Sequence, residues 1–267
     1  MLKDEIKMST IKKRRSVSWV LLALGLVALA ISVIYTSSVL AFIGLGLTFW
    51  GLLSFYITNE KYVKQTLLDS TITPSLANLN QMLAELKYKG KSIYLPPKYL
   101  KEFETIKVYI PKYKNTNLPT PQEIQQQEDK TFLRNPEGAL INPPGASLSN
   151  LFEKTLGKSF TIVDLEYLQL NLPKLFIEDL EIAENLEIQM KDNSIHVRIT
   201  NSIFKDMCKD PQKPFRMCDT IGCPLCSAIA CAIAKASGNL VTIEESHVSQ
   251  DGEVIEVCYR LIEEKRN

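Results

Sequence analysis

The sequence is poor in the residues and motifs on which many enzyme active sites are built. It contains two histidines, His196 and His247, in 267 residues. It has no glycine-rich phosphate loop, no Gly-x-Ser-x-Gly and no His-Glu-x-x-His. These absences argue against the nucleotide hydrolases, serine hydrolases and zinc proteases that depend on those motifs.

Neither sign of charge is in excess. The 31 Lys and Arg residues and 30 Asp and Glu residues leave a net charge of +1, so we expect no nucleic-acid partner held by bulk electrostatics. Charged residues at 23% beside a 45% hydrophobic fraction exclude a disordered chain. With 11 glycines and 13 prolines the chain is not collagen-like, and six cysteines in this length do not make a disulfide scaffold.

Charged residues are also absent from two long apolar runs near the N-terminus, residues 17–36 and 39–58. About 20 helical residues cross a hydrocarbon core of roughly 30 Å. Because two residues separate the runs, we predict an antiparallel transmembrane hairpin, and a cleaved signal peptide is the less favoured alternative. The hairpin has no Asp, Glu, Lys, Arg or His and no Gly-x-x-x-Gly pair. It is therefore interpreted as an anchor and not as part of a transport path. The sequence also gives no motif for dimerisation through these helices.

Lysine and arginine predict how this hairpin is oriented. The cluster in front of the first run is Lys12, Lys13, Arg14 and Arg15, and Lys61 and Lys64 follow the second run. The positive-inside rule then places both termini in the cytoplasm, with residues 1–16 as a cytosolic basic tail. We expect localisation in the cytoplasmic membrane, with membrane lipid as a partner. The cluster could also bind anionic lipid.

Two intermediate regions follow the hairpin. Residues 59–90 are predicted to hold a juxtamembrane amphipathic helix that starts at Thr73-Pro74 and stops at Gly90, with leucines on one face. A short coiled coil, and so a homodimer, is the alternative reading of those leucines. Residues 91–145 hold eight of the prolines, with short strands predicted at 92–95 and 105–110 and a polar loop at 121–130.

The remaining residues, 146–267, predict an α+β domain with an antiparallel sheet. Helices are expected at 147–157 and 223–237, each ended by a glycine, and a helical turn at 201–208. A hairpin with a turn at Asp192-Asn193 is expected across 186–200. A second hairpin, with strands 240–246 and 253–261, turns at Asp251-Gly252. The predicted fold is therefore a cytosolic α+β domain anchored by an N-terminal two-helix transmembrane hairpin.

Cysteines give the one concentrated chemical signal of this domain. The candidates for a ligand or metal site are Cys218, Cys223, Cys226, His247 and Cys258. Cys223-x-x-Cys226 is a knuckle-like pair that other thiols or His247 would complete as a zinc site. Its spacing from Cys218 and Cys258 also resembles that of plant-type ferredoxins, which makes an iron–sulfur cluster the less favoured metal reading.

Two other readings of the pair remain open. A dithiol at a helix N-terminus resembles the motif of thioredoxin-like oxidoreductases, where the unpaired N–H groups stabilise a thiolate. The residues before Cys223 are not a strand, however, and no βαβ unit follows. The alternative without a chemical role is that these cysteines pack in the core, as we expect for Cys231. His196 is expected on a solvated strand face.

A resemblance to a known family supports a ligand-binding interpretation. The pieces that carry it are HVRITNSIF at 196–204, the helix ending AKASG at 234–238, LVTIEESH at 240–247 and EVCYRLI at 256–262. Together they resemble the C-terminal part of 4-vinyl-reductase-type domains. That resemblance implies a small α+β module that binds small, often apolar molecules, in some cases with a cysteine-bound metal. His247 stands where the family usually has a cysteine. The whole chain is otherwise similar to prokaryotic membrane proteins, archaeal ones included.

The expected function is a membrane-anchored ligand-sensing or interaction module, with a small molecule or a protein as its partner. One alternative is a thiol-redox or metal-dependent enzyme that uses Cys223 and Cys226. The other is a structural tether for a soluble partner. No catalytic residue is assigned.

Overall fold

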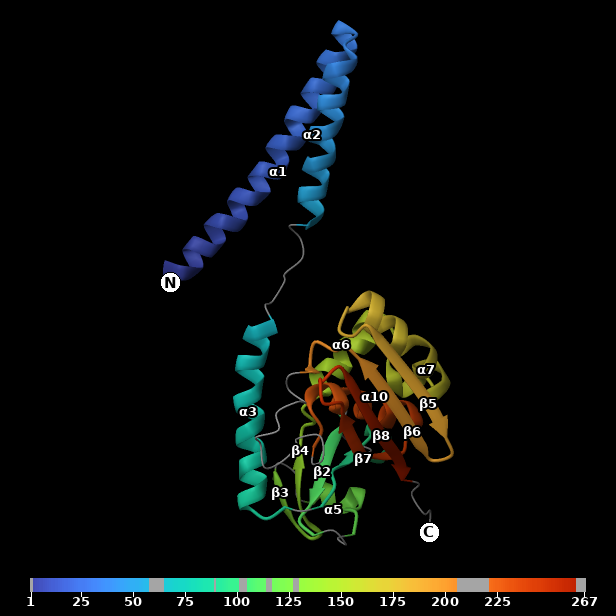
Figure 1. The fold of residues 1–267 in the computed structure, drawn as a ribbon. Coiled ribbons are helices and arrows are strands. Elements are labelled where there is room, and N and C mark those ends of the chain that lie inside the picture. Colours follow the sequence, from blue (N-terminus) through green and yellow to red (C-terminus); the bar gives the residue numbers. More distant parts are fainter. Residues whose placement is uncertain are drawn as a thin grey trace. The chain divides into compact units, whose positions relative to one another are not determined.

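The fold is taken from a computed structural model, which describes residues 2–57, 65–88, 90–100, 105–113, 117–126, 130–205 and 221–262 (Figure 1). The chain divides into two compact units, Met1–Lys64 and Gln65–Asn267.

The first unit is a pair of packed helices, α1 (Leu2–Tyr35) and α2 (Ser38–Ile57). The face between them is made of small residues, because Gly25, Gly44 and Gly51 each lie directly against the backbone of the other helix. A β-carbon on Gly44 would lie 2.9 Å from the Leu29 nitrogen. Ser18 and Ser32 complete the α1 side at seven-residue spacing from Gly25 and are buried. Small residues at this spacing let the two backbones approach closely.

Large apolar side chains of this unit point away from the helix contact. Examples are Trp19, Val33, Phe42, Trp50 and Tyr56, which are all more than half exposed. Among the described residues, one helical stretch, Ser18–Tyr35, is long and apolar enough to cross a membrane, and Ser38–Ser54 is a shorter apolar helix. The unit therefore carries its small residues inside and its large apolar residues outside.

In its described residues, the second unit contains strands, short helices and four longer helices. In chain order they are α3 (Gln65–Glu85), β1 (Ile93–Leu95), α4 (Pro97–Leu100), β2 (Lys107–Pro111), α5 (Pro121–Gln125), β3 (Phe132–Arg134), β4 (Glu137–Ile141), α6 (Ala146–Leu156), the 3-10 turn η1 (Phe160–Ile162), α7 (Leu165–Lys174), the π-helical turn η2 (Leu175–Asp179), β5 (Asn185–Lys191), β6 (Ser194–Thr200), α10 (Pro224–Ser237), β7 (Leu240–Val248) and β8 (Val254–Ile262).

The eight strands form one sheet in the order β3-β4-β2-β1-β7-β8-β6-β5, and all its pairs are antiparallel. This confirms the α+β class with an antiparallel sheet. Strands from residues 91–145 make one half of the sheet and strands from the C-terminal region make the other. The two halves join where β1 pairs with β7, and the Thr242 hydroxyl donates to the Ser92 carbonyl at 2.9 Å across that junction.

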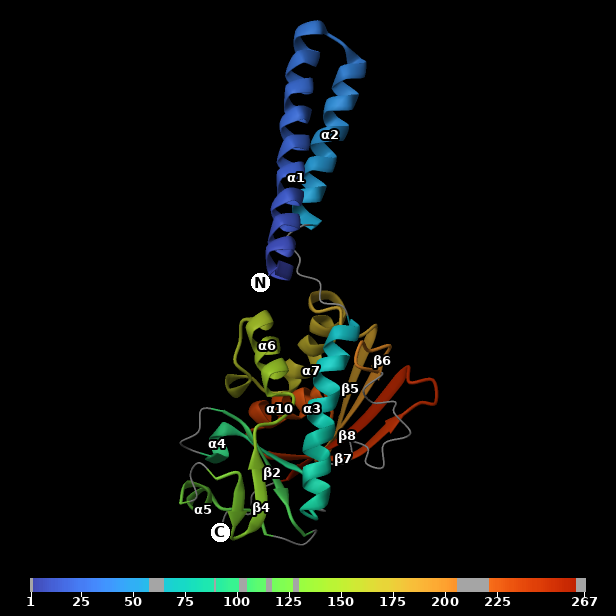
Figure 2. The same ribbon diagram turned by 90° about the vertical axis from the view of Figure 1, so that its left-hand side faces the viewer.

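Apolar side chains cover one face of this sheet and part of the other. The larger core lies between the sheet and the helices, with α10 packed against α6, α7, β1, β7 and β8 (Figure 2). Leu83 of α3 belongs to the same core. A smaller core lies at the β1–β2 half, where Leu100 of α4 and Ile124 of α5 pack with Tyr109. Over strands β5 to β8 the face opposite α10 carries polar side chains.

Several sequence expectations are confirmed. The hairpin β5–β6 turns at Asp192, which adopts a positive φ of 50°. The hairpin β7–β8 turns through Gly252 at φ 76°. Helices α6 and α10 end at Gly157 and Gly238, both left-handed, as helix-terminating glycines do. Cys231 is fully buried, and His196 is exposed on its strand.

The predicted boundaries of the juxtamembrane helix are wrong. Helix α3 begins at Gln65, so Pro74 lies inside it instead of at its start. The helix ends before Gly90, because Lys87 takes the left-handed conformation with φ 60° and Tyr88 N–H bonds to the Leu83 carbonyl at 3.0 Å. A lysine thus adopts the terminating conformation that was expected of a glycine.

The polar loop expected at 121–130 is also partly wrong, because residues 121–125 form helix α5. Thr120 and Glu123 cap its start reciprocally, and Pro121 occupies the first turn. Ile124, the apolar residue of this stretch, is buried in the smaller core. Residues 127–129 lie outside the described part of the chain, as do residues 206–208 of the helical turn expected at 201–208.

The contact between α1 and α2 predicts unequal effects for two neighbouring glycines. Gly44→Leu should force the helices apart, because its side chain meets the α1 backbone, whereas a β-carbon on Gly46 meets no atom within 4 Å. Overpacking typically costs about 1–3 kcal/mol. Both tryptophans of the chain lie in this unit, so tryptophan emission during an SDS titration reports on it selectively. Gly44→Leu should lower the SDS midpoint, and Gly46→Leu should leave it unchanged. Equal midpoints for the two variants would contradict the packing.

Candidate functional site

The Cys223–Cys226 pair lies at the start of α10, inside the larger core. Cys223 is the N-cap, and its Sγ accepts a hydrogen bond from the Cys226 N–H at 3.4 Å. Pro224 occupies the first helical position, where its missing N–H costs nothing. Both cysteines are fully buried. The helix therefore begins in the protein interior, without access of its first thiols to solvent.

Two tyrosines satisfy the backbone around this buried start. The Tyr94 hydroxyl of β1 donates to the Ile221 carbonyl at 2.6 Å, and the Tyr259 hydroxyl of β8 donates to the Cys226 carbonyl at 3.0 Å. Complete burial raises the pKa of Tyr94 well above its ordinary value. Burial likewise raises the pKa of the Cys231 thiol, one turn further along, so that thiol stays protonated. The surroundings of the pair are those of a packed core.

The predicted ligand residues are not brought together. None of the four described cysteines is in a disulfide, and no group of three His, Cys, Asp or Glu residues in the described ranges is placed to hold a metal ion. Cys218 lies in residues 206–220, outside the described residues. Cys258 alternates with Val257 and Tyr259, which face the core, so its side chain lies on the sheet face opposite Cys223 and Cys226.

On that opposite face, Cys258 meets one residue that the sequence did not single out. His196 on β6 pairs with Cys258 on β8, and Cys258 pairs in turn with Glu245 on β7. The Cys258 Sγ lies 4.0 Å from His196 Nε2 and 4.0 Å from a carboxylate oxygen of Glu244. A shift of register in β7 between Ile243 and Glu245 sets the position of Glu244. A cysteine, a histidine and two carboxylates therefore gather on one open face.

Electrostatics make the Cys258 thiol a weak nucleophile. Partial burial, then the carboxylates of Glu244 and Glu245, raise its pKa, and the Arg260 guanidinium opposes them. Arg260 is itself paired with Glu244 at 2.5 Å. Because the thiolate is the reactive form, a raised pKa leaves little of it at neutral pH. The arrangement does not activate Cys258 for covalent catalysis.

His247 lies on the same face but not in this cluster. It is exposed and sits opposite Glu256, in the next cross-strand row from Cys258. Glu256 pairs with Arg198 at 3.7 Å. His247 therefore has a surface position, and the cross-strand neighbours around it alternate in charge.

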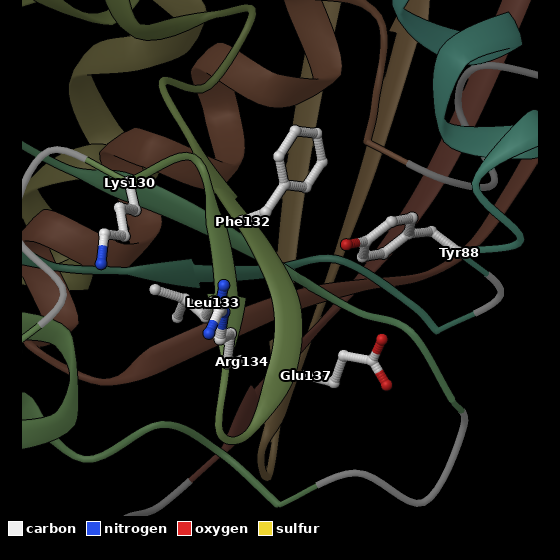
Figure 3. A pocket seen from close by; sticks show the side chains of 6 residues that line it. All are labelled: Tyr88, Lys130, Phe132, Leu133, Arg134 and Glu137. Carbon is white, nitrogen blue, oxygen red and sulfur yellow. The ribbon is translucent and has the colours of Figure 1, made fainter.

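A separate hollow of about 420 Å³ lies at the edge strand β3 (Figure 3). Its lining residues are Tyr88, Lys130, Phe132, Leu133, Arg134 and Glu137. Tyr88 lies in the turn after α3, whereas the other five lining residues lie on or next to the β3–β4 hairpin. The rings of Tyr88 and Phe132 lie 6.1 Å apart, at an interplanar angle of 39°. The volume falls in the range of small-molecule sites.

The β3–β4 hairpin beside this hollow is packed closely against Tyr109. A β-carbon on Gly138 would lie 2.2 Å from the Tyr109 ring, so only glycine fits there. The Tyr109 hydroxyl donates to the Glu137 carbonyl at 3.3 Å. The Glu137 carboxylate forms an ion pair with Lys112. Partial burial is the main reason why the pKa of Tyr88 is raised, so its hydroxyl stays protonated.

Sequence reasoning missed this hollow entirely. The alternation of Phe132, Leu133 and Arg134 indicates a strand, but no local signal joins that strand to Tyr88 more than forty residues earlier. The contact depends on where the turn at Lys87 directs the chain. It exists because of tertiary packing.

Comparison with known proteins gives one match. A family model described as "Domain of unknown function (DUF7982)" matches residues 1–260, which cover the helix pair and nearly all of the sheet unit. No curated protein and no solved structure matches the chain.

The geometry of the cysteines predicts a clear order of reactivity. In native protein, Cys258 should be alkylated by iodoacetamide while Cys223, Cys226 and Cys231 stay unmodified, because Cys258 is the one of these four described cysteines that is not fully buried. Its rate should rise about tenfold for each pH unit until the pH approaches the raised pKa of the thiol. Glu244→Gln should speed the reaction at pH 7.5, and Arg260→Met should slow it.

Mass spectrometry of the digested chain measures each cysteine separately. Unfolded protein, in which all thiols react, gives the reference. Modification of Cys223 or Cys226 at the rate of Cys258 would show that α10 opens readily. Equal rates in the two charge variants would show that the carboxylates do not control the thiol.

Proposed function

Since the chain belongs to the DUF7982 family, whose function is unknown, we propose its function from its own residues: it is a two-span membrane-anchored protein whose α+β domain acts as a ligand-sensing or interaction module at the cytoplasmic face. No catalytic role is part of this proposal.

The main support for the membrane anchor is the distribution of residues in the first unit, which has small residues at its helix contact and large apolar residues on its exterior. A water-soluble helix pair buries its large apolar residues and exposes polar ones. Here Gly25, Gly44 and Gly51 form the contact, while Trp19 and Trp50 are 61% and 60% exposed. In lipid, close packing of small residues holds helices together and the large apolar side chains face the acyl chains. At 20 residues, α2 is about 30 Å long, which is the length that the proposed second span requires.

Charge supports the proposed orientation. The cluster Lys12 to Arg15 lies in α1 directly before the apolar stretch, and the turn between α1 and α2 carries no charge. The positive-inside rule then keeps both termini in the cytoplasm. The α+β domain, which follows α2, would accordingly be cytosolic.

The hollow at β3 supports the ligand-sensing part. It has the volume of a small-molecule site and an aromatic pair in its wall. The resemblance of residues 195–262 to 4-vinyl-reductase-type domains remains part of the proposal, since those domains bind small molecules. A cysteine-bound metal is a weaker part of it, because Cys223 and Cys226 are fully buried and Cys258 lies on the opposite sheet face.

Two alternatives are less well supported. A thiol-redox enzyme would need its dithiol to meet a partner, and the complete burial of Cys223 and Cys226 would require α10 to move first. A structural tether needs a surface for a soluble partner. The polar face of β5 to β8 is accessible, but its charges alternate in sign and indicate no partner of one charge.

Tryptophan fluorescence tests the anchor directly. In phosphatidylcholine–phosphatidylglycerol vesicles, lipids with brominated acyl chains should quench both tryptophans, and acrylamide in the water should not. Because Gly51 packs against Leu22, Trp50 lies about 5 Å further along the hairpin than Trp19. Trp19→Phe protein should therefore be quenched more strongly by deeply brominated lipid than Trp50→Phe protein. Efficient acrylamide quenching with no lipid quenching would refute the anchor.

Fusion reporters test the orientation in cells. Green fluorescent protein on the C-terminus should fluoresce, because it folds in the cytoplasm. Alkaline phosphatase inserted after Ser37 should be active, because it needs the external side. Replacing Lys12, Lys13, Arg14 and Arg15 by Gln should weaken this bias, since those charges set it. An active phosphatase at the C-terminus would contradict the proposed orientation.

A further inference from the structure

The residues that line the hollow at β3 also indicate the chemical class of ligand that it would bind. This inference rests on the ligand-sensing part of the proposed function. Its walls combine apolar surface with charge. Phe132 is a large apolar side chain that is 43% exposed at the edge of the sheet, and the buried Leu133 lies beside it. Exposed aromatic surface in a hollow of this size favours a ligand that covers it.

The two rings are suited to a planar guest. Tyr88 and Phe132 are tilted by 39° with centroids 6.1 Å apart, so their faces are neither stacked nor perpendicular. A flat ring can contact such a pair in offset or edge-to-face geometry. The Tyr88 hydroxyl, kept protonated by burial, can donate a hydrogen bond to it.

The charge of the lining is positive on balance. Lys130 precedes β3 and Arg134 is its last residue, and the carboxylate of Glu137 is paired with Lys112, next to the hollow. The lining therefore has two cations and one carboxylate, and Lys112 beside the hollow offsets the charge of that carboxylate. An arginine guanidinium binds a planar carboxylate with two parallel hydrogen bonds, which a lysine cannot do. The electrostatics thus favour an anion over a cation.

We propose that the hollow lined by Tyr88, Lys130, Phe132, Arg134 and Glu137 binds small aromatic carboxylates, with the ring against Tyr88 and Phe132 and the carboxylate at Arg134 and Lys130. The open face around Cys258 is a poorer candidate for such a ligand, because Glu244 and Glu245 add negative charge there.

The test compares three probes of one shape and different charge: 2-naphthoate, 2-naphthamide and 2-(aminomethyl)naphthalene. Each is titrated calorimetrically into the full chain in lipid nanodiscs, with empty nanodiscs as the blank. We expect one naphthoate per chain and at least tenfold weaker binding of the amide and the amine, since a charge-assisted hydrogen bond discriminates by about that factor.

Variants locate the site. Arg134→Gln should weaken naphthoate binding about tenfold, and Phe132→Ala should weaken all aromatic probes. Both side chains are exposed, so neither change should unfold the domain, and circular dichroism checks this. Arg198→Gln and Leu170→Ala are the matched controls, since they remove an exposed charge and an exposed apolar side chain elsewhere. Both controls should bind within twofold of the parent chain.

Each other outcome overturns the inference in a recognisable way. If the amide or the amine binds as tightly as naphthoate and Phe132→Ala removes it, the ligand class is wrong while ligand sensing at this hollow stands. If naphthoate binds but neither Arg134→Gln nor Phe132→Ala weakens it, the site is elsewhere. If none of the probes binds, the inference is refuted and the hollow no longer supports the ligand-sensing proposal. The membrane anchor is tested separately, by tryptophan quenching.

Discussion

The burial of α10 is the constraint on which the rest of the α+β unit depends. Every residue from Pro224 to Lys235 is buried, so the polar groups at both helix ends need partners inside the protein. At the start, the Cys223 Sγ accepts from the Cys226 N–H, and the Tyr94 and Tyr259 hydroxyls donate to the carbonyls of Ile221 and Cys226. At the end, the Lys235 ammonium is held by Glu153 at 2.8 Å and by Asn150 at 3.0 Å. A buried charge of this kind is stable only while it is paired.

The same helix explains why the fold needs small side chains at its centre. A β-carbon on Gly145 would lie 2.1 Å from the Ala228 nitrogen, and the Gly145 N–H donates to the Ser227 hydroxyl at 3.0 Å. Alanine, serine and cysteine on α10 allow α6 and the sheet to approach this closely. In this setting the cysteines are small apolar residues with a capping role. The presence of Cys223 and Cys226 at this point is therefore explained by packing at the start of α10.

The junction of β1 with β7 decides where accessible sites can form. It joins two four-stranded halves into one sheet, so that each half has one face in the larger core. On the other face, α4 and α5 cover the β1–β2 half, and the polar face of β5 to β8 stays open. The hollow arises at the far edge, where β3 has a neighbour on one side alone. The two accessible features of the domain thus lie at the places that the core leaves uncovered.

By itself, the sequence determined the features that depend on neighbouring residues. The charge-free runs, the hairpins at Asp192 and Gly252 and the helices ended by Gly157 and Gly238 follow from local hydrophobicity and backbone preference. It left α7 unrecognised and misplaced the ends of α3, because Pro74 and Lys87 act against their usual local preferences there. Tertiary structure alone decided the burial of the cysteine pair, the meeting of Cys258 with His196, and the hollow between Tyr88 and Phe132. Those contacts join residues far apart in the chain, and no local pattern encodes which strand will lie beside which.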